Sequence, residues 1–185
     1  ADGVSGVVRL TLVSHGMTDA MAAGRFPTDE PLNAIGRRQV ADAPTGIMTA
    51  ERAYCGPEAR AIQTADLLGV QAQIEPKLAD LDHGRWRGDV LSRVQPAELA
   101  IWLTDPTQAP HGGESVVALI ARVRAWLDSL TSERVRVVAA THPAVIRAAV
   151  LVVLDAPPKS FWRIDIAPAS HTVLHFRGHA WTLRS

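Results

Sequence analysis

The feature that most constrains the fold is a segment rich in β-branched and aliphatic side chains over residues 7–13, which stops at Ser14, His15 and Gly16. About seven such residues are typical of a buried strand. The glycine after the polar pair lets the backbone turn sharply. In open α/β sheets, ligands bind beyond the carboxyl ends of strands, so His15 stands where such a fold places its chemistry. The alternative is that His15 merely ends a strand.

Composition favours one domain over residues 1–185 and argues against several classes of function. Of the 185 residues, 47% are hydrophobic, which is enough for a substantial core. The 19 basic and 19 acidic residues argue against a broad nucleic-acid-binding or membrane-binding surface, but not against a small anion pocket. No apolar run is long enough for a membrane span, and residues 1–6 lack the features of a signal peptide. The single cysteine, Cys55, excludes an internal disulfide, so a cytoplasmic location is expected.

Hydrophobic periodicity predicts strands that alternate with helices. The predicted strands cover residues 7–13, 52–55, 70–74, 134–141, 161–166 and 170–176, with a last short strand ending near residue 183. The predicted helices cover residues 32–48, 58–68, 96–103, 114–130 and 144–154, and Pro44 ends or kinks the first of them. This alternation predicts a three-layer α/β/α sandwich with a mostly parallel central sheet. Short connections near the end favour an antiparallel member among the last strands.

Polar residues follow several of these predicted strands. His15 follows the first strand, His142 follows the fourth, and Arg60 lies in the first turns of the second helix. Asp80 and Asp82 lie in the loop after the third strand. Because parallel strands end at one edge of a sheet, we expect two histidines, an arginine and a carboxylate to converge there.

These group types suit phosphoryl transfer. A neutral imidazole can attack phosphorus and carry the phosphoryl group as a covalent intermediate. A guanidinium offers a planar fork of donors to the phosphoryl oxygens, and a second, protonated histidine adds positive charge. A carboxylic acid can protonate the leaving oxygen and then, as carboxylate, activate water. This chemistry needs no metal or other cofactor, and the chain has neither a GxxxxGK[ST] loop nor a GxGxxG fingerprint.

Motifs along the chain resemble those of the histidine phosphatase superfamily, which contains the cofactor-dependent phosphoglycerate mutases. The family pattern L-x-R-H-G-E-T is similar to residues 12–18, G-R-x-x-[DN]-x-x-L-x-x-x-G-x-x-Q to residues 24–39, and R-A-x-Q-T-A to residues 60–65. Further along, L-x-E-x-x-x-G-x-W-x-G is similar to residues 78–88, G-G-E-S to residues 112–115, and H-x-x-x-I-R to residues 142–147. The matches keep the family order and agree with the predicted α/β/α sandwich.

The resemblance implies a metal-independent phosphomonoesterase that acts on a small phosphorylated metabolite, with no nucleic-acid or membrane partner. It implies a phosphohistidine at His15, phosphoryl binding by Arg60 and His142, and an acid/base role for Asp80, with Asp82 as the alternative. As the leaving-group acid, Asp80 is expected to have a pKa that is raised either by burial or by the charge of bound substrate. Further substrate contacts are expected from Ser14, Thr18 and Arg25. The oligomeric state is left open.

Several residues depart from the family pattern. Ser14 replaces the arginine before the nucleophile, and loss of a preorganised donor costs roughly 10²–10³ in rate, so reduced efficiency is expected. Met17 and Met21 make the rim less polar, and Arg87 stands where the family is commonly acidic. An alternative function follows, in which a catalytically impaired family member binds a ligand or partner, or acts on a weakly charged non-phosphate substrate. The four retained site residues favour the enzyme.

Three histidines near the end of the chain, His171, His175 and His179, are spaced four residues apart. On a strand and a turn this spacing does not cluster their rings. We therefore expect them to be solvated or hydrogen-bonded rather than to bind a metal.

Overall fold

The computed structural model describes residues 7–43, 49–132 and 134–184. Within these residues, six strands form one sheet in the order β3-β2-β4-β1-β5-β6. The strands are β1 (Val7–Ser14), β2 (Arg52–Cys55), β3 (Gln73–Ile74), β4 (Arg136–Thr141), β5 (His171–Arg177) and β6 (Ala180–Leu183). The first four run parallel to one another, whereas β5 is antiparallel to both β1 and β6. The expected antiparallel member is therefore present at this end of the sheet.

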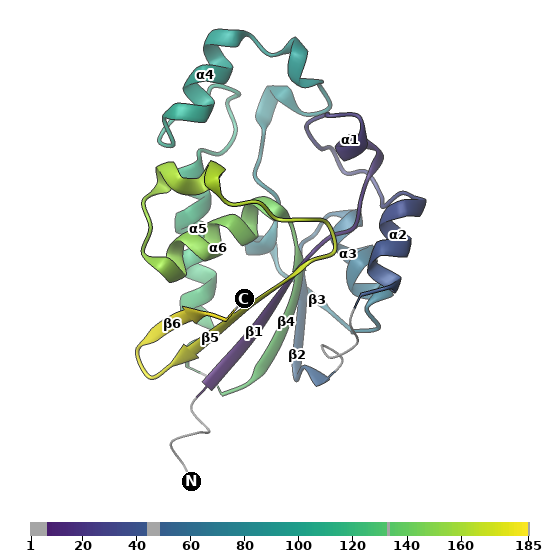
Figure 1. Ribbon diagram of the computed structural model, residues 1–185, viewed down its shortest axis with the longest axis vertical. Coiled ribbons are helices and arrows are strands. Elements are labelled where there is room, and N and C mark those ends of the chain that lie inside the picture. The colour runs from purple at the N-terminus through teal and green to yellow at the C-terminus, as the bar shows by residue number, and fades with distance from the viewer. Residues whose placement is uncertain (1–6, 44–48, 133, 185) are drawn as a thin grey trace.

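Helices cover both faces of the sheet, as the sequence predicted. The α-helices are α1 (Asp19–Ala22), α2 (Ala34–Ala41), α3 (Ala59–Leu67), α4 (Pro96–Thr104), α5 (Val116–Ser129) and α6 (Pro143–Leu154). The 3₁₀ helices are η3 (Pro76–Leu78), η4 (Gly84–Trp86), η5 (Leu91–Arg93) and η6 (Pro158–Arg163). Figure 1 shows α2 and α3 on one side of the sheet and α5 and α6 on the other, which makes the three-layer sandwich.

The core forms because alternate residues of β1 point to opposite faces of the sheet. Leu10 and Leu12 are buried in the larger cluster, which includes residues of α5 and α6, whereas Val13 packs in a second cluster with Val138 of β4. The strand is continuously buried only over its last three residues, 12–14, next to the carboxyl edge of the sheet, whereas Arg9 near its start is exposed.

Three predicted elements differ clearly from the structure, of which the strand predicted over residues 70–74 is shortened to β3. The strand predicted over residues 161–166 is wrong, because this segment overlaps the 3₁₀ helix η6. Pro158 begins that helix, and Phe161 packs edge-on against Trp162, with 4.8 Å between the ring centroids. The helix predicted over residues 32–48 is shorter, because the Asn33 side chain caps α2 and the helix ends at Ala41. The expectations for Pro44 and for residues 1–6 fall outside the described residues.

Candidate active site

The two predicted histidines lie side by side because of the strand register. Strand β1 pairs with β4 so that Ser14 lies opposite Thr141, and His15 and His142 are the next residues on each strand. The His15 backbone N–H donates to the Thr141 carbonyl at 3.0 Å. Both histidines are buried, and their ring centroids lie 5.1 Å apart at an angle of 68°. The carboxyl edge of the sheet thus brings together residues more than a hundred positions apart.

The arginine and the carboxylate reach the same place from the neighbouring strands. Arg60 is the second residue of α3, which follows β2, and only 2% of its side chain is exposed. One guanidinium nitrogen, Nη2, donates to Asp80 Oδ2 at 2.6 Å, and Nη1 donates to the Thr28 carbonyl at 2.8 Å. Asp80 follows η3 after β3, and its other oxygen accepts from the Leu81 N–H at 2.8 Å. All four predicted residues therefore converge.

The His15 ring is held in the form that a nucleophile requires. Its Nδ1 lies 2.8 Å from the Gly16 carbonyl oxygen. Because a carbonyl only accepts, Nδ1 bears the hydrogen and Nε2 keeps a free lone pair. Burial, followed by the nearby charge of His142, lowers the pKa of His15 to about 4. The ring is therefore uncharged at neutral pH.

The turn after His15 leaves no space for a side chain at residue 16. A Cβ on Gly16 would lie 2.4 Å from the Gly36 carbonyl oxygen of α2. A Cβ on Gly36 would in turn lie 2.1 Å from the Met17 carbonyl oxygen. The two glycines let α2 pack directly against the turn that presents His15, which explains the spacing of glycines in this part of the sequence.

Glu58 is a residue of the site that the sequence did not predict. Its Oε1 lies 2.7 Å from His142 Nε2, and its Oε2 accepts from the Asp80 N–H at 2.8 Å. Burial raises the pKa of Glu58, but the hydrogen bond and charge of His142 outweigh it, so the net shift is downward. An ionised carboxylate only accepts, so His142 Nε2 bears a hydrogen. Glu58 lies between the end of β2 and the start of α3. It could have been found from the sequence, because residues beyond the carboxyl ends of parallel strands are the ones expected to meet.

The pKa of Asp80 is lowered in this structure, not raised. Burial favours its neutral form, but the charges of His142 and Arg60 outweigh burial and hold its pKa well below the usual range. His142 Nδ1 lies 3.6 Å from Asp80 Oδ2. Burial alone therefore does not give the expected raised pKa, because the charges of His142 and Arg60 lower it by more; a rise caused by the charge of bound substrate stays a prediction. The direction of the shift depends on a contact that spans 20 positions of sequence.

Two cavities share the Arg60–Asp80 pair in their lining. His15 lines a cavity of about 160 Å³, together with Arg60, Asp80 and apolar residues from α1, α6 and η6. A second cavity of about 460 Å³ is lined by Glu58, Asp82 and Arg87 and shares Arg60 and Asp80 with the first. We call the cavity that His15 lines the His15 cavity; a group bound there would lie next to the predicted nucleophile.

The three further residues expected to touch substrate differ in their surroundings. Ser14 is fully buried, and its hydroxyl donates to the Ala167 carbonyl at 2.6 Å and accepts from the Ser170 N–H at 2.9 Å. Thr18 is also fully buried; its hydroxyl caps α1 by accepting from the Met21 N–H and donates to Glu30 Oε1 at 3.3 Å. Among these three, only Arg25 lines the His15 cavity, and its guanidinium donates to the Gly88 carbonyl at 3.1 Å.

Asp82, the alternative acid/base, lies apart from the nucleophile. It lines the second cavity but not the His15 cavity, and one of its oxygens accepts from the Gly84 N–H at 2.9 Å. This bond is typical of an aspartate that stabilises a turn.

In the described parts of the chain, no three His, Cys, Asp or Glu residues are grouped so as to hold a metal ion. The described helices also include none long and apolar enough to cross a membrane.

Comparison with known proteins gives consistent matches over nearly the whole chain. The family model described as the histidine phosphatase superfamily (branch 1) matches residues 10–185. Phosphoserine phosphatase 1 of Hydrogenobacter thermophilus is 26% identical over 184 residues, which cover 91% of this chain and 87% of that protein. Glucosyl-3-phosphoglycerate phosphatase of Mycobacterium tuberculosis is 29% identical over 139 residues, 67% of this chain and 60% of that protein.

Solved structures agree with this fold. A mycobacterial glucosyl-3-phosphoglycerate phosphatase in complex with VO3 superposes with a TM-score of 0.85 at 28% identity, covering 95% of this chain and 96% of that one. A mutant phosphoserine phosphatase of Entamoeba histolytica in complex with phosphoserine gives a TM-score of 0.87 at 21% identity, covering 96% and 95%. At this identity the second likeness concerns the fold alone.

Proposed function

Because this chain belongs to the histidine phosphatase superfamily (branch 1), we propose that it is a metal-independent phosphomonoesterase that works through a phosphohistidine at His15. The observation that carries the proposal is the neutral His15 ring, whose Nδ1–H bonds to Gly16 and whose Nε2 is free. Arg60 and Asp80 line the same cavity, so a phosphate binder and an acid/base accompany the nucleophile.

Binding of the phosphoryl group rearranges the charges around Asp80. In the ligand-free protein, Asp80 is the anion that Arg60 binds. A phosphoryl group beside His15 competes for that guanidinium and places further negative charge near the carboxylate, which raises the pKa of Asp80. A phosphomonoester bound as its monoanion also brings a proton, since its second pKa is about 6. Asp80 takes up this proton and becomes the acid of the first step.

The reaction then proceeds in two balanced steps. His15 Nε2 attacks phosphorus, the bond from phosphorus to the ester oxygen breaks, and Asp80 donates its proton to the leaving alcohol. In the second step Asp80 accepts a proton from water as the water oxygen attacks phosphorus. The bond from phosphorus to nitrogen breaks, and inorganic phosphate and neutral His15 result. Arg60 and His142 stabilise the charge on the transferring group, and Glu58 fixes the His142 ring through the bond to Nε2.

Two finer points belong to this proposal. The substrate is a small phosphorylated metabolite, which is supported by the two relatives named for dephosphorylating phosphoserine and glucosyl-3-phosphoglycerate. Turnover is of reduced efficiency, because residue 14 supplies no guanidinium and the Ser14 hydroxyl is bonded to the backbone carbonyl of Ala167 and the backbone N–H of Ser170.

The proposed location is the cytoplasm. Cys55 is buried and free, which agrees with a reducing compartment of this kind.

The test is a screen of phosphorylated metabolites and p-nitrophenyl phosphate, with the His15→Ala protein as the blank. Wild-type protein is expected to release phosphate and, after an acidic or alkaline quench of single-turnover reactions, to show acid-labile, alkali-stable phosphate on His15. Phosphate binding without release from any ester would favour the alternative, a family member that only binds its ligand.

A further inference from the structure

Arg147 extends from α6, the helix that directly follows His142, and reaches the His15 cavity. It lies five residues further along α6, a rise of about 7.5 Å along the helix axis. Its Nε donates to the Ile164 carbonyl at 2.7 Å, and its guanidinium carbon lies 5.7 Å from the centre of the Phe161 ring. These two contacts fix the side chain, which lines the cavity that contains His15.

The charge of Arg147 has no acidic partner within the described residues. None of the ion pairs closer than 4.0 Å in these parts of the chain includes Arg147. Its described hydrogen bonds use only Nε, so its two Nη groups have no acceptor among the described residues. Burial lowers the pKa of Arg147, and Asp165 and Asp80 only partly oppose this shift. A half-buried cation with unused donors is costly unless a ligand supplies the acceptors.

The arginines and carboxylates that line the His15 cavity differ in whether they have a partner of opposite charge. Arg25 lines the His15 cavity from a different segment, and its described bond is to the Gly88 carbonyl rather than to a carboxylate. The acidic groups of the cavity are already bonded. Asp80 pairs with Arg60, and Glu30 accepts from Thr28 and Thr18. Arg25 and Arg147 are thus the lining arginines that the described carboxylates leave unpaired.

We propose that Arg147, assisted by Arg25, binds a carboxylate on the substrate a few bonds from the phosphate ester. This inference rests on the proposed phosphatase function and names the substrate class. A carboxylate is a small planar anion that matches the paired donors of a guanidinium. Met21, Leu81 and Trp162 line the same cavity and contact the carbon skeleton between the two anions. At about 160 Å³ the cavity favours a short skeleton, because it must also hold the phosphoryl group.

A matched pair of substrates tests this assignment. Glycerol 3-phosphate and 3-phosphoglycerate share a three-carbon skeleton, and the second has a carboxylate in place of a hydroxymethyl group. For the wild-type protein, kcat/KM is expected to be about 10–10² higher for 3-phosphoglycerate, the range for a charge-assisted hydrogen bond. The Arg147→Met protein is expected to lose this preference to within about 3-fold, because kcat/KM falls much more on 3-phosphoglycerate than on glycerol 3-phosphate or p-nitrophenyl phosphate.

Further variants separate substrate recognition from a structural role. Arg147→Lys keeps the charge and is expected to retain part of the preference, and Arg25→Gln on another segment is expected to reduce it. Arg163, an exposed residue of η6 that does not line the cavity, gives the control Arg163→Gln, which should behave as wild type. If Arg147→Met does not fold, the preference in the Lys and Arg25 variants decides the question.

Equal loss on all three substrates in a folded Arg147→Met protein would overturn the carboxylate assignment and make Arg147 structural. Wild-type protein that hydrolyses p-nitrophenyl phosphate but treats the matched pair alike would also overturn it, while the phosphatase function stands. No hydrolysis of any ester, together with no phosphohistidine, would overturn both the assignment and the function on which it rests.

Discussion

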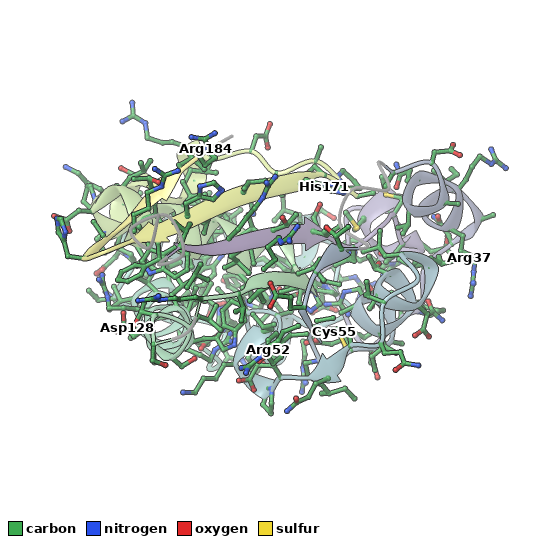
Figure 2. All side chains as sticks on the ribbon, turned by 90° about the horizontal axis from the view of Figure 1, so that it is seen from below. Arg37, Arg52, Cys55, Asp128, His171 and Arg184 are labelled. Carbon is green, nitrogen blue, oxygen red and sulfur yellow. The ribbon has the colours of Figure 1, made fainter. Side chains whose placement is uncertain are left out.

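The parallel strands β1 and β4 and the antiparallel strand β5 all contribute buried histidines, yet only the parallel pair presents a candidate site. His15 and His142 follow strands whose carboxyl ends lie at one edge, next to the start of α3 and of α6. His175 lies within β5, opposite Arg9 of β1, and therefore in the middle of a strand rather than beyond its carboxyl end. Figure 2 shows His171 and Arg184 towards one edge of the sheet and Cys55 of β2 towards the opposite edge.

Hydrogen bonding separates the two regions as clearly as strand direction. In the site, each ring has one bonded nitrogen, since His15 Nδ1 bonds to Gly16 and His142 Nε2 bonds to Glu58, although His142 Nδ1 has no hydrogen-bond partner among the described residues. In β5, both ring nitrogens of His175 and Nε2 of His171 are buried without a partner among the described residues. The comparison teaches that burial and residue type do not make a site by themselves. The surrounding groups must also set the tautomer and charge of the ring.

The largest expected difference comes from removing one histidine from each region. His15→Ala is expected to lower kcat/KM on p-nitrophenyl phosphate by about 10⁴ or more, because no other side chain is placed to hold the phosphoryl group. His175→Ala is expected to stay within about 2-fold of wild type. Phosphate release by both proteins, with circular dichroism to verify the fold, checks the contrast. A fully active His15→Ala protein would contradict the mechanism.

Arginines of the two regions give the next contrast. Arg60→Gln removes a buried guanidinium aimed at the transferring group, and we expect a loss of about 10²–10³ in kcat. Arg184→Gln, in the region of His175 and Arg9, is expected to leave kcat unchanged. Steady-state kinetics on one aryl phosphate measures both. A similar loss in the two variants would mean that the effect is one of overall charge.

A smaller, substrate-dependent loss is expected for the carboxylate. Asp80→Asn removes the proton donor, so hydrolysis of an alkyl phosphate should fall by about 10², within the range for general acid–base catalysis. An aryl phosphate with a good leaving group needs less protonation and should lose far less. Asp82→Asn removes the negative charge but keeps an oxygen that can accept from the Gly84 N–H, so it should change both rates little. If Asp80→Asn slows both esters equally, the acid role passes to another group.

The smallest expected effect concerns stability at acidic pH. The pKa of His15 falls from the ordinary 6.5 to about 4 in the folded protein. Between these values the unfolded chain binds a proton that the folded chain does not, so stability is complete above pH 6.5 and decreases as the pH falls towards 4. At about 1.4 kcal/mol per pKa unit, this amounts to on the order of 3 kcal/mol.

Urea unfolding of wild type and His15→Gln between pH 7 and pH 4 measures this contribution. The variant is expected to lose less stability over the range, because glutamine does not titrate. His111 is fully buried beside Trp102, and burial likewise lowers its pKa to about 4, so a part of the acid sensitivity remains in the variant. An equal pH dependence of the two proteins would contradict the assigned pKa of His15.

Much of this molecule could be derived from the sequence alone. The alternation of apolar runs and helical patterns predicted the α/β/α sandwich, and the family to which the motifs pointed is confirmed. The rule that parallel strands end at one edge of a sheet predicted that His15, Arg60, Asp80 and His142 lie close together. These results depend on local periodicity and on strand direction, which the order of residues along the chain encodes directly.

The tertiary structure alone decided what those residues contact. Glu58 meets His142 across 84 positions, and Arg60 meets Asp80 across 20, so neither the oriented ring nor the low pKa of Asp80 could be predicted from local pattern. Residues 161–166 show the same limit, since their apolar spacing suits a strand while Pro158 and the packing of Phe161 impose a 3₁₀ turn. Charge state and side-chain partners arise from long-range packing, because electrostatic and burial energies depend on distances that only the folded chain establishes.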